Sequence, residues 1–458
     1  MTELLDLCYD VLIRILEEVD AGDLASCAQT SWSFYRFIQN NARLFKHHYL
    51  KNFDDPRRKA ADAEPEWILE LQKVVRLQKV MESGNLDVKS ENFAFVHEMT
   101  ESLISTASLE NNQSRNVAEL SRLITIPGNT DAFLSKSSLY ARGGTSTQKA
   151  ASTEEQRQLS AKLHCYYGIP DTPAGRRTLS THPYARSRVY DLRHYTTQNG
   201  WGPYLSDGSM RVDWEMIEAL MVDVAYNSGM CCRRLLTRFR LPWSEPFEGI
   251  VHEPNANEPK HPLGIPKQID APLDSRDPYG VSGIWSRIVC FLDYTDLYNL
   301  NFSTEALLLP LTEPRAPIST EEAIRHILMR LRVVRIEEPD EDSHPSYPVV
   351  YFQGTSYAVH ASWDPNASSR IRGSVRMTKH GDVRWNTVSV FHGEERWASD
   401  GIQVGGVRSS RGVIGTWFDK DFDEHGPAGP TVFWKLCDGH DDDELDSDEE
   451  EFAFYSEN

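Results

Sequence analysis

The chain has 458 residues, a formal net charge of −20 and seven cysteines. Its length predicts about three domains, and its hydrophobic content of 40% provides enough material for packed cores. No basic segment precedes an apolar run at the N-terminus and no apolar run reaches about 18 residues, so we expect neither a secreted nor a membrane-spanning protein. An odd number of cysteines without a CxxC pair argues against a disulfide framework and a zinc site, and favours a cytoplasmic or nuclear address.

Short helices are predicted between Leu4 and Phe53. The first has an apolar face with helical period, made by Val11, Leu12, Ile15, Leu16 and Val19. A second is expected after Asp20 and an aromatic third after Ser31. The last carries Leu44, Phe45, His48 and Tyr49. A unit of this size hides only about 60% of its unfolded surface, so either a partner or the rest of the chain should cover the remainder.

The order of these elements resembles the F-box, a helical module that docks on the Skp adaptor of a cullin-type ubiquitin ligase. The similarity lies in the Leu4-Leu5 pair, Leu7, the first helix, the Asp23-Leu24 step, Cys27, the aromatic helix and Leu44-Phe45. Cys8 stands where many F-boxes have proline, so the start of the first helix is less firmly fixed. The resemblance implies adaptor binding through Leu4, Leu5, Leu7, Val11, Leu12, Ile15, Leu16, Leu24, Trp32, Leu44 and Phe45.

Composition divides the chain into an F-box, a helical spacer, a flexible linker, a mixed middle region with a Pro-rich wrap, a β-barrel and a disordered acidic tail. Their respective bounds are 1-55, 56-140, 141-160, 161-278, 279-437 and 438-458. The fold class is therefore α+β. In a second interpretation, the spacer residues form a helical wall of the next domain. In the middle region a core helix is expected after Asp213, with Trp214, Ile217, Leu220, Met221 and Val224 at helical spacing.

Short strands at close intervals predict a sandwich or barrel in the C-terminal part. We expect them at Ile284 to Leu292, Leu331 to Glu338, Val349 to Phe352, Arg370 to Met377, Val383 to Phe391, Gly401 to Val407, Gly412 to Phe418 and Thr431 to Leu436. A helix is expected at Glu321 to Met329. Glycines within the strands suit the bends of a curved barrel, namely Gly373, Gly405, Gly406 and Gly415.

From Asp213 onward the sequence resembles a group of F-box proteins widespread in filamentous fungi. The resemblance lies in the runs DPYGVSGIW, HASWDPNASSRIRGSVRMTKHGDVRW, FHGEERWASDGIQVGGVRSSRGVIGTWFDKD and HGPAGPTVFWK. The C-terminal domain is similar to the lipocalin-like barrel of some other substrate-receptor F-box proteins, and Gly283-Ile284-Trp285 is similar to the Gly-x-Trp near the first lipocalin strand. The resemblance implies a substrate receptor without naming its substrate.

Arg370, Arg372 and Arg376 share one face of one expected strand. Arginine can hold a carboxylate or phosphate with two hydrogen bonds at once, and tryptophan is enriched at binding hot spots. These arginines, with Trp385 and Trp397, are therefore candidates for a pocket that binds an acidic, phosphorylated or C-terminal peptide. In the alternative interpretation the arginines are solvated and the tryptophans belong to the core.

Acidic residues concentrate between Asp438 and Asn458, where eleven Asp and Glu occur without Lys or Arg. This charge argues against nucleic acid as the main partner. A basic cluster in the middle region is interpreted either as a nucleic-acid contact or as a solvated face, and contains Arg176, Arg177, Arg186, Arg188 and Arg193. Ser447 lies in an acidic context preferred by casein-kinase-type enzymes and is a candidate phosphosite.

The sequence contains no HExxH, GxSxG, Walker-type or GxGxxG motif, so we expect a protein that is not an enzyme. Glu424 stands where a calcium loop needs glycine, and no metal or other cofactor is expected. Two functions remain open. One is the substrate-recognition subunit of an SCF-type (Skp, cullin, F-box) ubiquitin ligase, whose barrel binds an unknown protein substrate. The other is a barrel-based ligand-binding or scaffold protein, tethered by its F-box without ubiquitin transfer.

Overall fold

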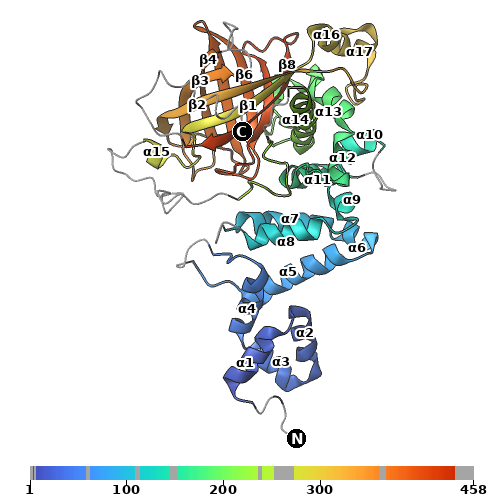
Figure 1. Ribbon diagram of the computed structural model, residues 1–458, viewed down its shortest axis with the longest axis vertical. Coiled ribbons are helices and arrows are strands. Elements are labelled where there is room, and N and C mark those ends of the chain that lie inside the picture. The colour runs from blue at the N-terminus through green and yellow to red at the C-terminus, as the bar shows by residue number, and fades with distance from the viewer. Residues whose placement is uncertain are drawn as a thin grey trace. The chain divides into compact units, whose positions relative to one another are not determined.

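The computed structural model describes residues 4, 7–57, 62–108, 114–144, 152–235, 240–251, 273–359 and 368–438 (Figure 1). Leu5, Ser447 and nearly all of the expected acidic tail lie outside the described residues, as does much of the Pro-rich stretch. The chain forms two compact units, Met1–Phe133 and Leu134–Asn458. The expected F-box and most of the expected spacer therefore belong to one unit, and the middle region and barrel belong to the other.

The first unit is built from helices α1 to α9, and the predicted F-box helices are all present. Ser31 caps α3, because its Oγ accepts a hydrogen bond from the Phe34 N–H at 3.2 Å. The expected helical spacer contains the long helix α5, which begins at Trp67. The helices are α1 (Tyr9–Glu18), α2 (Ala21–Thr30), α3 (Trp32–Gln39), α4 (Ala42–Asn52), α5 (Trp67–Glu82), α6 (Leu86–Glu91), α7 (Phe93–Ser105), α8 (Arg115–Ile124) and α9 (Asn129–Phe133).

Asp54 joins the end of the F-box helices to the helices that follow. Its buried carboxylate accepts hydrogen bonds from the Ser114 Oγ at 2.6 Å and from the backbone N–H groups of Ser108 and Arg115, both at 3.0 Å. Tyr49 and Trp67 add an aromatic contact between α4 and α5, with ring centroids 5.8 Å apart. The F-box and the helices after it therefore share one core.

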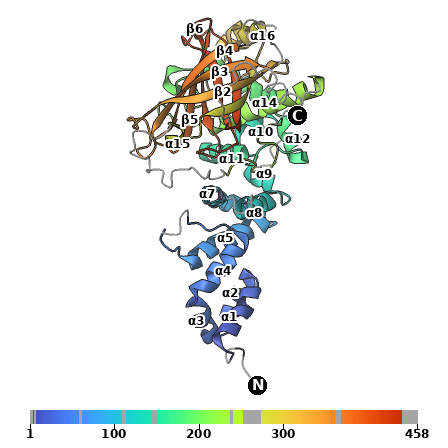
Figure 2. The same ribbon diagram turned by 60° about the vertical axis from the view of Figure 1, so that its left-hand side comes forward.

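The second unit contains helices on one side of a barrel. Helix α14 confirms the predicted core helix, since Ile217, Leu220 and Val224 are buried and the Asp213 carboxylate accepts from the Met216 N–H at 3.2 Å. The helices are α10 (Ser138–Arg142), α11 (Glu154–Tyr167), α12 (Pro173–Leu179), α13 (His182–Val189), α14 (Trp214–Leu235), α15 (Leu273–Arg276), α16 (Tyr294–Phe302) and α17 (Thr304–Leu308). In Figures 1 and 2, α15 and α16 lie at opposite ends of the barrel.

The expected linker at 141-160 is wrong at its described ends, because α10 reaches Arg142 and α11 begins at Glu154. Thr153 and Gln156 form a capping box, in which each side chain accepts a hydrogen bond from the other residue's backbone N–H at 3.2 Å. This reciprocal cap fixes the start of α11 earlier than composition indicates.

Eight antiparallel strands close into a barrel in sequence order, with β8 paired to β1 (Figure 1). The predicted C-terminal β-barrel is therefore confirmed. The strands are β1 (Gly283–Phe291), β2 (Ala323–Glu337), β3 (Val349–Ala358), β4 (Ser368–Met377), β5 (Val383–Phe391), β6 (Glu394–Gln403), β7 (Val413–Asp419) and β8 (Ala428–Cys437).

The helix expected at Glu321 to Met329 is wrong. These residues lie mostly in β2, which pairs with β1 over Ala323–Leu331 and with β3 over Ile327–Glu337. Leu, Met and Arg have good helix propensity, but hydrogen bonds to two neighbouring strands outweigh a preference of a few tenths of a kcal/mol per residue.

Glycine has the expected role at two of the four predicted positions. A Cβ on Gly373 would lie 2.1 Å from the Asn386 carbonyl oxygen, and one on Gly415 would lie 2.0 Å from the Asp400 carbonyl oxygen. Only glycine allows the strands to coil so closely there. Gly405 and Gly406 follow β6 in a turn, with φ of 90° and 91°, so their assignment to a strand is wrong.

The interior of the barrel is apolar toward the end that carries α15. Alternation along the paired strands places Trp285, Trp385 and Phe433 on the inner face, where they form a cluster with ring centroids 4.9 to 5.8 Å apart. Tyr279 and Val281 close this end: the Trp285 Nε1–H donates to the Val281 carbonyl at 2.9 Å, and the Tyr279 hydroxyl donates to the Pro348 carbonyl at 2.9 Å.

A separate core lies between α14 and the outer faces of β1, β7 and β8. The basic cluster of the middle region borders this core and is largely paired with carboxylates. Arg186 is buried against Asp223 and Glu322, Arg188 pairs with Asp213 at 2.7 Å, and Arg193 pairs with Asp191 at 2.6 Å. These three arginines therefore hold the unit together, so neither the nucleic-acid contact nor the solvated face describes them.

Candidate functional site

Large apolar side chains are exposed on the F-box helices. On α1, Val11 and Ile15 are 45% and 39% exposed and lie one helical turn apart on the same face. On α3, Trp32 is 74% exposed and packs only at its edge against Tyr35, with ring centroids 5.4 Å apart. Exposed leucines precede α1 at Leu4 and Leu7. Such a gathering of apolar groups on two short helices is typical of a protein-binding surface.

The predicted adaptor-binding residues fall into two groups. Leu4, Leu7, Val11, Ile15 and Trp32 are exposed and able to touch a partner directly. The others are buried within the unit and support that surface from behind, namely Leu12, Leu16, Leu24, Leu44 and Phe45.

The structure adds two aromatic residues that the sequence-based set omitted, Tyr9 and Tyr35, which are 52% and 44% exposed. Tyr9 lies beside Phe37, with ring centroids 5.7 Å apart, so the start of α1 reaches α3. The helical spacing of Trp32 and Tyr35, three residues apart, was the signal available in the sequence.

Buried polar groups fix α4 against α1 behind this surface. The buried Glu17 carboxylate lies 3.6 Å from the Arg43 Nε and 3.4 Å from an Arg14 nitrogen. His48 is buried and its Nε2–H donates to the Leu16 carbonyl at 2.9 Å. Burial lowers the pKa of His48 below its usual 6.5, because the charged imidazolium loses hydration, so the ring is neutral in the folded unit at neutral pH.

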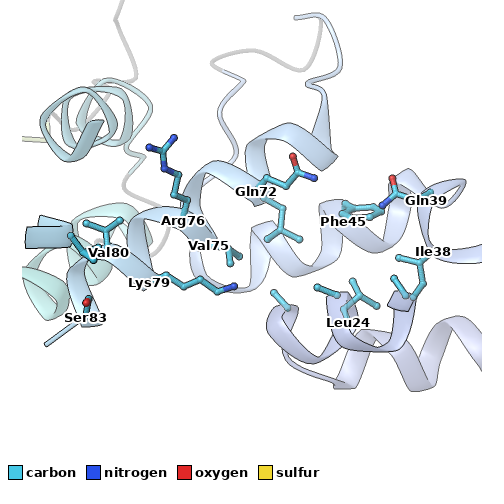
Figure 3. Close-up of a pocket in the computed structure, with 15 residues that line it drawn as sticks. Leu24, Ile38, Gln39, Phe45, Gln72, Val75, Arg76, Lys79, Val80 and Ser83 are labelled. Atoms are coloured by element: carbon cyan, nitrogen blue, oxygen red, sulfur yellow. The ribbon is translucent and has the colours of Figure 1, made fainter. Parts of the chain in front are cut away.

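A pocket of about 450 Å³ lies between the F-box helices and α5. Leu24, Ile38 and Phe45 line it from the F-box, and Leu71 and Val75 line it from α5. Figure 3 shows the side chain of Lys79 extending from α5 into the space between the two sets of helices. The pocket is thus apolar with a basic edge, and both its walls belong to the first unit.

The five residues of the predicted substrate pocket do not converge. Arg370, Arg372 and Arg376 point outward from β4, whereas Trp385 is buried in the barrel interior. Arg372 forms an ion pair with Glu395, and Arg376 pairs with Asp340 at 2.5 Å. Trp397 is half-buried and packs against Trp417 at 5.3 Å between ring centroids. Because a strand alternates its side chains between two faces, the proposal of a single Arg and Trp pocket is wrong.

Among the described residues, no group of three or more His, Cys, Asp or Glu side chains is arranged to hold a metal ion. The described part of the chain likewise has no helix with the length and apolarity that crossing a membrane requires.

Comparison with known proteins identifies the N-terminal region. A family model for the F-box domain matches residues 4–46. The searches of curated proteins and of solved structures found no match to this chain. The match covers α1 to α3 and the start of α4, which carry the exposed apolar side chains described above. Residues 4–46 of this chain are therefore an F-box domain, in a protein whose C-terminal part forms a closed eight-stranded antiparallel β-barrel.

Proposed function

We propose that this chain is the substrate-recognition subunit of an SCF-type ubiquitin ligase. The observation that carries the proposal is the F-box domain with exposed Val11, Ile15 and Trp32 on its helices. F-box domains dock on a Skp-type adaptor, which in turn binds a cullin. Covering these apolar side chains with an adaptor supplies the favourable free energy that docking needs.

In this function the barrel binds a protein substrate and the chain itself performs no chemistry. Ubiquitin transfer belongs to the other subunits of the ligase. A substrate held on a tethered receptor reaches an effective concentration of about millimolar near the charged conjugating enzyme, which is sufficient to direct modification of its lysines.

A second candidate is a barrel-based ligand-binding or scaffold protein that the F-box tethers without ubiquitin transfer. The observation that favours it is the closed barrel, whose inner face carries polar groups in addition to the aromatic cluster. Enclosed interiors of this kind suit a small ligand as well as a peptide segment.

Co-purification separates these functions. The wild-type chain and a Val11→Asp, Ile15→Asp variant are expressed in their own cell type, captured by a tag, and probed for the Skp-type adaptor and the cullin. We expect the wild type to retain both and the variant to lose both, because two charges would be buried in the docking interface. Leu86→Asp, on the α6 helix at 65% exposure, is the matched control and should retain both.

Wild-type protein that retains adaptor but no cullin would favour the tethered ligand-binding function. Absence of the adaptor from both the wild type and the Val11→Asp, Ile15→Asp variant would contradict both functions, and equal capture of the adaptor by both would refute the assignment of Val11 and Ile15 to the docking surface. Circular dichroism of each purified variant verifies that its helices remain folded.

A further inference from the structure

Arg287 is a buried arginine inside the barrel that has no carboxylate partner in the described parts of the chain. It lies on the inner face of β1, two residues from Trp285, and its side chain is 6% exposed. Its Nε–H donates to the Thr431 hydroxyl at 2.9 Å, and its guanidinium carbon lies 5.9 Å from the centre of the Phe433 ring. Among the described residues, no acidic side chain forms an ion pair with it.

Three other arginines of the second unit are equally buried, and each is compensated. Arg186 contacts the carboxylates of Asp223 and Glu322. Arg315 lies 3.3 Å from Asp191 and donates to the Ala306 carbonyl at 2.6 Å. Arg411 donates to several backbone carbonyls, including those of Tyr166 at 2.6 Å and Glu248 at 2.8 Å. Arg287 is therefore the exception among these four.

An unpaired buried guanidinium costs folding free energy, because it loses hydration without gaining a counter-charge. Burial accordingly lowers the pKa of Arg287 to about 10, and the group still carries its charge at neutral pH. A hydrophobic side chain would fill the same interior position at less cost. An anion that binds beside the Arg287 guanidinium would compensate this charge while it is bound.

The inner face on the far side of Arg287 from the aromatic cluster carries hydroxyl groups among apolar side chains. The Ser356 and Ser369 hydroxyls lie 2.7 Å apart, and those of Thr387 and Ser399 lie 2.6 Å apart. The pairing register places these four residues on the same inner face as Arg287. Hydroxyls bonded to one another keep lone pairs for a ligand.

Inner-face side chains near the end of the barrel that carries α16 and α17 are more accessible than those around the aromatic cluster. Trp285, Met329 and Trp385 are buried at the opposite end. Along the same inner face, Ser389 and Trp397 are half-buried near the α16 end. Among the described residues named here, the more accessible inner-face side chains thus lie on the α16 side of Arg287.

We propose that the barrel interior binds a ligand through a carboxylate group that Arg287 receives. One guanidinium matches the single charge of a carboxylate and offers it two parallel hydrogen bonds. The remainder of the ligand extends past the paired hydroxyls toward Trp397 and Trp417. The carboxylate belongs either to a small organic acid, as in the ligand-binding function, or to the C-terminus of a peptide, which would deepen the substrate-receptor function proposed above.

Binding of matched probes to the full chain tests the proposal. One pair is a mixture of linear C4 to C10 carboxylic acids and their methyl esters. The other is a mixture of acetylated tripeptides with a free C-terminal carboxylate and the same peptides as carboxamides. In ligand-observed NMR with titration, we expect at least one free-carboxylate mixture to bind about tenfold more tightly than its uncharged counterpart. The pair that shows this preference identifies the source of the carboxylate.

Two substitutions test whether the preference for carboxylate probes depends on Arg287. Arg287→Met should abolish it, and Arg287→Lys should retain part of it, because lysine keeps the charge without the two-pronged geometry. Arg332→Met, which removes an exposed arginine from the outer face of β2, is the matched control and should bind as the wild type does. Because an uncompensated charge is removed, Arg287→Met should unfold at the same temperature as the wild type or a higher one.

Several results would overturn the proposal. These are equal binding of charged and uncharged probes, no binding of either carboxylate mixture up to about 1 mM, and an unchanged preference in Arg287→Met. A melting temperature of Arg287→Met more than about 5 °C below that of the wild type, or failure to fold, would show that Arg287 is structural instead. None of these measurements involves the adaptor, so failure here is distinguishable from failure of the proposed ligase function.

Discussion

Replacing Trp32 with alanine tests the docking surface quantitatively. An aromatic side chain presents about 200 Å² of surface, so an exposure of 74% leaves about 150 Å² for a partner to cover. At about 25 cal/mol per Å² this amounts to about 3.7 kcal/mol as an upper bound. The area that alanine would still bury and the cost of ordering the indole reduce the expected loss to about 2 kcal/mol, or about thirtyfold in Kd.

The same substitution should hardly change the stability of the chain. Trp32 contacts Tyr35 at its edge and lies 5.9 Å from the Arg36 guanidinium, both at the surface. We therefore expect the free energy of unfolding to change by about 0.5 kcal/mol or less. Isothermal titration calorimetry with the purified Skp-type adaptor measures the Kd, with Leu86→Ala as the matched control. An unchanged Kd for Trp32→Ala, with wild-type binding intact, would refute the assignment of Trp32 to the interface.

Three further predictions concern stability. Asp54→Ala leaves the Ser114 hydroxyl and three backbone N–H groups without their buried acceptor, so denaturant titration should show about 3 kcal/mol lost from the first unit, whereas the exposed Asp87→Ala changes little. The pKa of His48 in the folded state is below 6.5, so the unfolded state binds the proton more readily and the free energy of unfolding falls as the pH drops below about 6.5. His48→Gln should reduce this pH dependence. If the free energy of unfolding of both proteins changed equally with pH, His48 would not be its source. Gly415→Ala places a Cβ 2.0 Å from the Asp400 carbonyl oxygen and should destabilise the barrel by about 3 kcal/mol or more in thermal unfolding, whereas Gly84→Ala, which has no heavy atom within 4 Å of the added Cβ, should be tolerated.

Local pattern predicted much of the architecture. The helical period of Val11 to Val19 and the cap at Ser31 located the F-box helices, because amphipathic periodicity and capping act within a few residues. The alternation from Arg370 to Met377 and the turn before Val383 likewise located a hairpin whose second strand has the predicted bounds. The sequence also located Asp213 as the start of α14, through the same local capping chemistry.

Pairing between distant segments decided what the sequence left ambiguous. Ala323–Glu337 became a strand because β1 pairs with its first part and β3 with its second part, which no local propensity reveals. The same strand register places Trp385 inside the barrel and the arginines of β4 outside it. The predicted Arg and Trp pocket therefore does not form.

For the F-box surface and the barrel interior, too, local sequence predicted one part and tertiary packing decided the other. Sequence by itself determined which residues of the first fifty are apolar, and a resemblance implied what they bind, but only packing showed that Leu12 is buried while Ile15 is exposed. Arg287 carries no distinctive signal in the sequence, since it is one arginine within a strand. Closure of the barrel buried it beside Trp285 and Phe433, with no acidic partner in the described part of the chain, because the neighbours of a side chain are set by strand register across the whole sheet.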